Sequence, residues 1–134
     1  MAQKKDKKTI VKKKKLAVKI TESGRVVINC TYNNTLITIS NGRGDVISWA
    51  TSGSIGFKGA KKSTPYASTL CAEEVAKKAM EKGVQVVDII TKGAGNSKIP
   101  AIKGIKQAGL KVRSITDRTS TPHNGCRARK RRRN

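Results

Sequence analysis

The sequence predicts a single α/β domain built on one mixed sheet, with a basic tail at each end. Its 134 residues suffice for one hydrophobic core but not for two of ordinary size. Short runs rich in β-branched residues fill the first half of the chain, and helical periodicity alternates with strand-like runs in the second half. We therefore divide the chain into a basic N-terminal arm (1–15), a globular domain (16–117) and a basic C-terminal tail (118–134).

The first part of the domain is predicted to be an antiparallel meander. The runs 16–20 and 25–32 are separated by the turn-forming TESG and form a hairpin. The run 34–40 follows an Asn-Asn corner, and the pair Asn41-Gly42 is a strong hairpin signal that leads into the run 45–50. The single tryptophan, Trp49, is expected in the core, since tryptophan is usually mostly buried.

The second part is predicted to add helices and parallel strands. A helix from Pro65 to Lys82 has one apolar face, a cap at Ser63 or Thr64 and an end at Gly83. A strand over 84–92, a helix over 99–108 and a strand over 110–116 follow. The three isoleucines of the second helix are expected on one side of it, and Gly109 closes it. A strand entered from a helix pairs in parallel, so the sheet is mixed, with helices packed on it.

The charge predicts a nucleic-acid partner. The chain has a formal net charge of +22, and the arm and the tail each hold +7 of it. Neither tail has the apolar face of a membrane-surface helix, and the sequence has no long apolar run, so no membrane partner is expected. We expect the tails to become ordered only against a polyanion, because their side chains cannot be buried.

The residues that bear reactive groups do not form a catalytic or metal site. The three cysteines have no paired spacing, which indicates a reducing compartment, and Cys30 and Cys71 fall on predicted buried faces. His123 and Cys126 lack the second pair that a zinc site needs. The acids are scattered, so no enzyme activity and no cofactor is expected.

Two glycine-rich loops are the candidate phosphate sites. Both follow strands and open helices, so they are expected at one edge of the sheet, where backbone N–H groups and lysines can meet phosphates. The first loop, 51–64, does not match the nucleotide-binding loop, since Lys61-Lys62-Ser63 lacks the preceding glycine. Phe57 either packs under this loop or wedges against a sugar or base. Each loop could instead be an ordinary connection without a ligand. The candidate residues are Gly53, Gly56, Lys58, Gly59, Lys61 and Lys62 in the first loop, and Lys92, Asn96 and Lys98 in the second.

Several segments together identify the chain as similar to a known family. YNNTLITI, SWATSGSIGFKGAKKSTPYA, the loop before IPAIKGIKQAGL, and SITDRTSTPHNGCR with its basic end resemble the universal small-subunit ribosomal protein eleven, in its bacterial form. The resemblance covers about residues 16–134. It departs at Ala94 and Lys98, where the family usually has proline and arginine, and at Ala128 and Arg129, where prolines are common.

The resemblance implies a ribonuclease-H-like arrangement and a structural, rRNA-binding role in the platform of the small subunit, near the messenger exit and the rRNA 3′ end. The implied partners are small-subunit rRNA and neighbouring ribosomal proteins, with messenger RNA nearby, in a cytoplasmic ribosome in preference to an organellar one. RNA contacts are expected at the corner, the loops and the tail, which adds these residues to the set: Asn33, Asn34, Arg118, His123, Asn124, Arg127, Arg129, Lys130, Arg131, Arg132 and Arg133.

Asn124-Gly125 is also a candidate for isoaspartate formation, because glycine leaves the next backbone N–H free to attack the side-chain amide; an ordinary turn is the alternative. Two other functions stay open at this point. A DNA-compacting protein would bind duplex DNA as well as structured RNA, and a nuclease would depend on acids such as Asp45, Asp88 and Asp117.

Overall fold

A computed structural model describes residues 22–131 and 133 of the chain. The expected strand at 16–20 and its hairpin lie outside the described residues. The elements that follow agree with the predicted ones to within about two residues at most ends. They are β1 (Ser23–Cys30), β2 (Thr35–Asn41), β3 (Val46–Thr51), a short 3₁₀ helix η1 (Gly59–Ser63), α1 (Pro65–Glu81), β4 (Val86–Lys92), α2 (Lys98–Gln107) and β5 (Lys111–Asp117).

The five strands form one mixed sheet in the order β3-β2-β1-β4-β5. β1 pairs antiparallel with β2, and β2 antiparallel with β3, whereas β4 pairs in parallel with β1 and β5. The backbone N–H of Arg118 donates to the carbonyl oxygen of Thr91, so the pairing of β5 with β4 continues into the first residue of the tail. The α/β class and the mixed sheet that the sequence predicted are confirmed.

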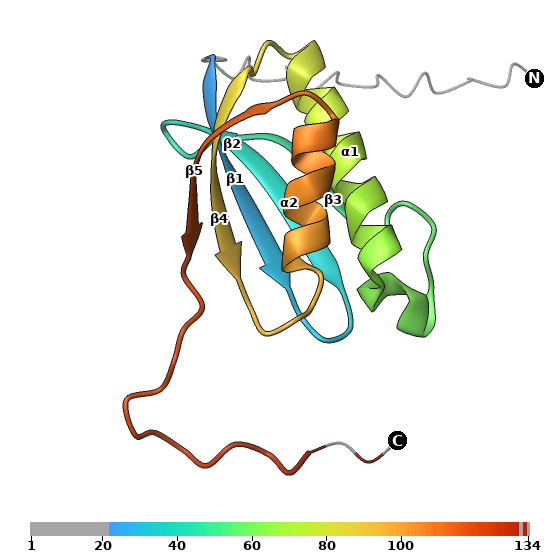
Figure 1. Cartoon of the computed structure of the whole chain (residues 1–134), viewed down its shortest axis with the longest axis vertical. Coiled ribbons are helices and arrows are strands. Elements are labelled where there is room, and N and C mark those ends of the chain that lie inside the picture. Colours follow the sequence, from blue (N-terminus) through green and yellow to red (C-terminus); the bar gives the residue numbers. More distant parts are fainter. Residues whose placement is uncertain (1–21, 132, 134) are drawn as a thin grey trace, which may run out of the picture.

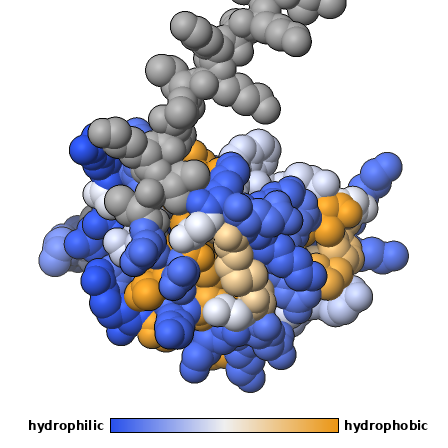
Figure 2. Space-filling model, turned by 90° about the horizontal axis from the view of Figure 1, so that it is seen from above, coloured by the Kyte–Doolittle hydropathy of each residue, from blue (hydrophilic) through white to orange (hydrophobic). Residues whose placement is uncertain are grey.

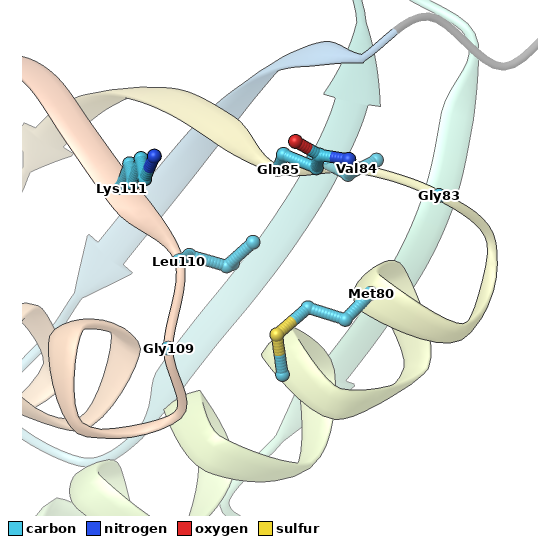
Figure 3. A pocket seen from close by; sticks show the side chains of 7 residues that line it. All are labelled: Met80, Gly83, Val84, Gln85, Gly109, Leu110 and Lys111. Carbon is cyan, nitrogen blue, oxygen red and sulfur yellow. The ribbon is translucent and has the colours of Figure 1, made fainter.

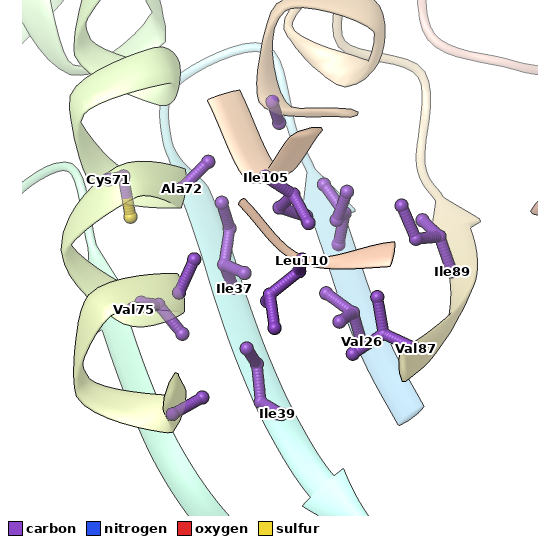
Figure 4. Close-up of a cluster of buried hydrophobic side chains, with 14 of the residues drawn as sticks. Val26, Ile37, Ile39, Cys71, Ala72, Val75, Val87, Ile89, Ile105 and Leu110 are labelled. Carbon is purple, nitrogen blue, oxygen red and sulfur yellow. The ribbon is translucent and has the colours of Figure 1, made fainter. Parts of the chain in front are cut away.

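Both helices pack on the same face of the sheet, and the core lies between them and the strands (Figures 1 and 4). α1 contacts β2 and β3, while α2 contacts α1 and β1. The buried side chains of the strands alternate with outward ones, as a half-covered sheet requires. Cys30 and Cys71 are fully buried in this core, as expected.

Local chemistry fixes where the elements begin and end. The side chain of Thr64 accepts a hydrogen bond from the N–H of Ala67 and Pro65 takes the first position of α1, so the predicted start is correct. Gly83 has a φ of 94° directly after α1, a conformation that suits glycine. In the β2–β3 hairpin, Oδ1 of Asn41 accepts from the N–H groups of Arg43 and Asp45, both at 2.9 Å. This side chain closes the turn that the Asn-Gly pair predicted.

A single glycine permits the close packing of the two helices. A Cβ atom on Gly104 of α2 would lie 2.8 Å from the carbonyl oxygen of Thr69 and 2.9 Å from the Cβ atom of Ala72, both on α1. Side chains larger than hydrogen therefore cannot occupy this crossing without displacing a helix.

Two predictions about apolar residues are wrong. Trp49 is 58% exposed, because it lies on the face of the sheet that neither helix covers. Ile99, expected beside Ile105 on one side of α2, is 66% exposed while Ile105 is buried. Because one helical turn holds 3.6 residues, side chains spaced three apart drift around the helix and do not stay on one face. The inward face of α2 is instead formed by Ala101, Gly104 and Ile105.

Candidate nucleic-acid interface

The corner between β1 and β2 is held by one threonine. The backbone N–H of Thr31 donates to the carbonyl oxygen of Asn34 at 2.9 Å, and its hydroxyl accepts from the N–H of Asn34 at 3.0 Å. Because the backbone is fixed in this way, Tyr32 and Asn33 project outward at the tip, and Tyr32 is 70% exposed. The corner thus presents a phenol and an amide to solvent, both able to contact an external partner.

The first glycine loop is more structured than the sequence predicted. Its second half forms η1, in which Lys61 is exposed and Lys62 half-buried. Its first half is anchored by an edge-to-face contact between Phe57 and Tyr66, whose ring centroids are 6.1 Å apart. Phe57 is half-buried in this contact, while Tyr66 is itself 67% exposed. Lys58 and the glycines beside it remain exposed at the surface of the loop.

The second glycine loop is seated directly on the end of β1. Gly93 has a φ of 105°, and a Cβ atom there would lie 2.1 Å from the carbonyl oxygen of Cys30. A Cβ atom on Gly95 would lie 2.5 Å from the carbonyl oxygen of Thr31. Glycine is therefore required at both positions by the close approach of the two backbones. Lys92 and Asn96 lie on either side of these glycines and are exposed.

The two loops meet, as their positions after strand ends predicted. The hydroxyl of Ser97 donates to the carbonyl oxygen of Ser63, 34 residues earlier, at 3.0 Å. Ser97 is the residue before α2, and this bond replaces the usual capping contact of such a serine with its own helix. The bond joins η1 to the start of α2, so Ala60 and Ser63, which flank the lysines of η1, line one hollow with Asn96.

The start of the tail is tied to the same region. The ammonium group of Lys98 lies 2.9 Å from Oδ2 of Asp117 and 2.8 Å from the hydroxyl oxygen of Thr119. Hydrogen bonds from the hydroxyl of Thr119 and from Lys98 lower the pKa of Asp117 to about 2. Lys98, expected to contact RNA, thus has an intramolecular partner that directs the tail.

Residues of the corner, the loops and the tail line a shared hollow at the end of the sheet where β1, β4 and β5 finish. These three strands end on the same side of the sheet (Figure 1). The volume of the hollow is about 1100 Å³. We call this region the basic end. The sequence predicted that the two loops lie at one edge, but not that Tyr32 and Ser63 line the same space. The hollow is lined by Tyr32, Asn33, Ala60, Ser63, Asn96, Ala128, Arg129, Lys130 and Arg131.

The described tail has no helix or strand after β5, and its side chains are exposed. His123, Asn124 and Arg127 belong to this stretch. Asn124 has a φ of 59°, the only non-glycine residue with a positive φ among those described. Asparagine tolerates this conformation better than most residues, in keeping with a turn at Asn124-Gly125. Arg132, which was expected to contact RNA, lies outside the described residues.

A second hollow differs from the basic end in size and in charge. This smaller hollow of about 280 Å³ lies at the opposite end, between Met80, Gln85 and Leu110, with Lys111 as its single cation (Figure 3). Seen from that end, the surface is mostly hydrophilic with separate apolar spots (Figure 2). Within residues 22–131 and 133, groups of three or more potential metal ligands are not found.

Each of the three carboxylates considered for a nuclease is hydrogen-bonded or ion-paired to its own set of neighbouring residues. Asp88 accepts hydrogen bonds from Arg113 and Ser114, and these bonds lower its pKa to about 2. Asp45 accepts from the side-chain amide of Asn41 in the hairpin turn. Asp117 is bound to Lys98, as described above. The three acids therefore do not form a shared metal-binding or catalytic group.

Comparison with known proteins shows which family the chain belongs to. The family model described as ribosomal protein S11 matches residues 24–133, which is most of the chain. The chain belongs to the ribosomal protein S11 family. One relative is the small ribosomal subunit protein uS11c of Oltmannsiellopsis viridis, which is 48% identical over 122 residues, covering 91% of this chain and 92% of the relative.

Membership of the S11 family settles the class of function. The chain is a structural component of the small ribosomal subunit and not an enzyme, and its partners are rRNA and neighbouring ribosomal proteins. The resemblance identified from the sequence is confirmed at the level of the family. In the described part of the chain, neither helix has the length and apolar character needed to cross a membrane.

Proposed function

We propose that the basic end is the surface through which this S11-family protein binds small-subunit rRNA, and that it holds the protein at the platform, near the messenger exit and the rRNA 3′ end. The observation that carries the proposal is the meeting of four separate segments around one hollow at the end of the sheet, two of which, the glycine loops, are joined by the Ser97–Ser63 bond. A backbone of phosphates needs several spaced cations and not one deep cradle, and this arrangement supplies them.

Each part of the basic end has a distinct role. Lys58, Lys61 and Lys62 neutralise phosphates, and Gly53, Gly56 and Gly59 allow the RNA backbone to approach the first loop. Asn33 and Asn96, which are exposed, offer amides to sugar and base edges, with Lys92 nearby, and Asn34, whose Oδ1 is buried, offers its Nδ2 group. Lys98 acts by holding Asp117, so its contribution to binding is the direction of the tail.

The tail carries a net charge of +7, the same as the arm. We propose that residues 118–134 follow a groove or junction between RNA helices, with arginines forking to phosphate oxygens or stacking on bases. The basic arm 1–15 acts in the same way, and the domain 16–117 positions both. This location would bring messenger RNA near the tail. The residues proposed to contact rRNA here are Arg118, His123, Asn124, Arg127, Arg129, Lys130, Arg131, Arg132 and Arg133.

We also propose the bacterial form of the family for this chain, on the strength of the motifs around the first loop and the tail. The named relative carries the designation uS11c, so an organellar ribosome is the alternative to the cytoplasmic one. Fractionation of the source cell and detection of the protein in one ribosome population distinguishes the two.

The test of the basic end is the salt dependence of binding to a small-subunit rRNA fragment. If about ten phosphates are engaged, the logarithm of the affinity should fall with the logarithm of salt concentration with a slope of roughly −7 to −9. Replacing Lys58, Lys61 and Lys62 with alanine should make the slope shallower by about 2 to 3. The matched control replaces three exposed lysines elsewhere, Lys77, Lys106 and Lys111, and should leave the slope nearly unchanged.

Two results would contradict this proposal. A slope near −2 for the unaltered protein would mean that only a few phosphates are engaged. Equal losses in the two triple variants would mean that net charge, and not the basic end, governs binding. A competition between the rRNA fragment and duplex DNA of equal length separates an rRNA-binding protein from a DNA-compacting one.

We propose, further, that Asn124 forms isoaspartate in a fraction of molecules. The support is the succession of asparagine and glycine on an exposed stretch with a positive φ at Asn124. Mass spectrometry with electron-based fragmentation of the peptide that holds Asn124, taken from assembled subunits, should detect the isoaspartyl linkage. Only unmodified asparagine in that peptide would overturn the idea.

A further inference from the structure

The sheet has a second face, which neither α1 nor α2 covers. Paired residues on neighbouring strands share a face, and the pairs Trp49–Thr38, Thr38–Val27 and Val27–Ile90 therefore form one row across four strands. Trp49 is 58% exposed, Val46 49% and Leu36 38%. We call the outward side chains of these strands the open sheet face. Its apolar and hydroxyl-bearing part consists of Val27, Leu36, Thr38, Val46, Trp49 and Ile90, and the paired residues Arg25 and Asp88 lie on the same face.

The charge of this face differs from that of the rest of the molecule. The chain carries a net charge of +22, yet the central rows of the open sheet face contain no lysine. Lys92 and Lys111 lie only at the ends of their strands. Away from the strand ends, Arg25 and Arg113 lie beside Asp88, and Arg113 is already bound to that carboxylate. The cluster therefore has a net charge of +1.

A surface of this composition does not suit RNA. Phosphates are bound by several spaced cations, which the central rows lack. Exposed apolar patches on small proteins mark protein interfaces, and tryptophan and arginine are the side chains that most often dominate the binding energy of such interfaces. The open sheet face lies along the flat of the sheet, whereas the basic end lies at the strand ends, so both surfaces can be occupied at once.

We propose that the open sheet face docks one neighbouring protein of the small subunit through an apolar surface, with Trp49 as the anchor and Arg25 as the group that receives a carboxylate or carbonyl oxygen from the partner. This inference deepens the proposed function, since it rests on attachment to rRNA through the basic end. Arg25 is exposed, and Asp88, its partner in the pairing of β1 with β4, already accepts hydrogen bonds from Arg113 and Ser114. An acceptor from the partner would complete this cluster.

The partner is identified by site-specific crosslinking in assembled subunits. The full chain carries a photoreactive benzoylphenylalanine in place of Thr38, at the centre of the row, and is isolated in salt-washed small subunits. We expect one crosslink, to a single other ribosomal protein, identified by mass spectrometry. The same group in place of Lys106, exposed on α2, is the control and should not crosslink to that protein. Crosslinks from position 38 to rRNA, to a second copy of this chain, to its own residues 1–21, or to nothing would each overturn the proposal.

A double variant then tests whether Trp49 and Leu36 hold the partner protein. Trp49→Ser together with Leu36→Ser should reduce the crosslink from position 38 by about tenfold, the loss typical of removing an anchor. The control is Ile115→Ser, which removes a side chain that is 56% exposed and pairs with buried Ile89, on the helix side of the sheet. An unchanged crosslink in the double variant would contradict the proposal.

Binding to the rRNA fragment is measured on the same proteins. The double variant should keep the affinity and salt slope of the unaltered chain, and a joint loss of both would show that the open sheet face is an RNA surface. If instead the Lys58, Lys61 and Lys62 variant kept full rRNA affinity while the crosslink persisted, the proposed role of the basic end would fail and the docking of a protein would stand. Urea unfolding of each variant confirms that the fold is intact.

Discussion

Lys98 and Asp117 join the beginning of α2 to the end of β5, with 2.9 Å between the ammonium nitrogen and Oδ2. The two residues are 19 positions apart, and Thr119 of the tail binds to both. β5 ends at Asp117, and this cluster, together with the hydrogen bond from Arg118 to Thr91, fixes the first residues of the tail. A lysine that the sequence assigned to RNA therefore helps to direct the tail away from the domain.

The first prediction is that Asp117→Asn loosens the start of the tail without unfolding the domain. The ion pair is at the surface, and such pairs contribute little to global stability, so the urea midpoint should hardly move. Amide hydrogen exchange at Thr119, whose N–H donates to Asp117, should become faster. The matched control is Glu74→Gln, which removes the Glu74–Lys78 pair of α1 and should leave exchange at Thr119 as it is. Unaltered exchange in Asp117→Asn would refute the role given to this cluster.

The second prediction concerns the pKa of Asp88. Hydrogen bonds from Arg113 and Ser114 lower this pKa from 3.8 to about 2, so the folded chain binds the proton less readily than the unfolded chain. The resulting stability is complete above the ordinary pKa and is lost as the pH falls from about 4 to about 2. NMR titration of the carboxyl carbon should give a midpoint near 2.

The same titration in Arg113→Ala should move the midpoint upward, toward the ordinary value of 3.8. A midpoint that is equal in both proteins would show that Arg113 is not the cause of the shift. Arg25→Ala is the informative control, because Arg25 acts on Asp88 only through its charge and is the smallest of the named causes. Its effect should be smaller than that of Arg113→Ala.

The order of the elements was predictable because their signals are local. The Thr64-Pro65 start of α1 and Gly83 at its end act within a few residues, and the structure confirms both. The position of the loops was also predictable, since both follow strand ends that must lie at one edge. What a sequence cannot show is which face of a sheet remains uncovered, and for that reason Trp49 was assigned to the core. A β-bulge between Ile39 and Ser40 further shifts the register of β3.

The candidate site was predictable as a set of segments but not as a set of contacts. The second loop was a candidate phosphate site or an ordinary connection, and the sequence could not show that its glycines, Gly93 and Gly95, make room for the backbone of β1. Lys98 looked like one more free cation because its partner, Asp117, is far away in the sequence. Contacts of this kind depend on the pairing of β4 with β5, which no local pattern specifies.

The third prediction is that Gly104→Ala destabilises the domain. The added Cβ atom would lie 2.8 Å from the carbonyl oxygen of Thr69, so the helices must separate. Overpacking of this kind costs about 1 to 3 kcal/mol, which outweighs the gain in helix propensity of about 1 kcal/mol. Urea unfolding measures the difference. The control is Gly42→Ala, where an added Cβ atom has no neighbour within 4 Å and φ is not positive, so stability should change little. A Gly104→Ala protein as stable as the original would show that the crossing can relax.

The fourth prediction is that only one of the three thiols reacts in the folded chain. Burial raises the pKa of Cys30, and burial followed by the nearby Glu74 raises the pKa of Cys71 to about 12, while Cys126 is exposed on the tail. The thiolate is the reactive form, so iodoacetamide at neutral pH should label Cys126 alone, and intact-mass spectrometry should record one adduct. In urea all three should react, and the Cys126→Ser protein should acquire no rapid label when folded. Rapid labelling of Cys30 or Cys71 without denaturant would mean that the core between α1 and the sheet opens far more readily than its packing implies, because both thiols are buried in that core.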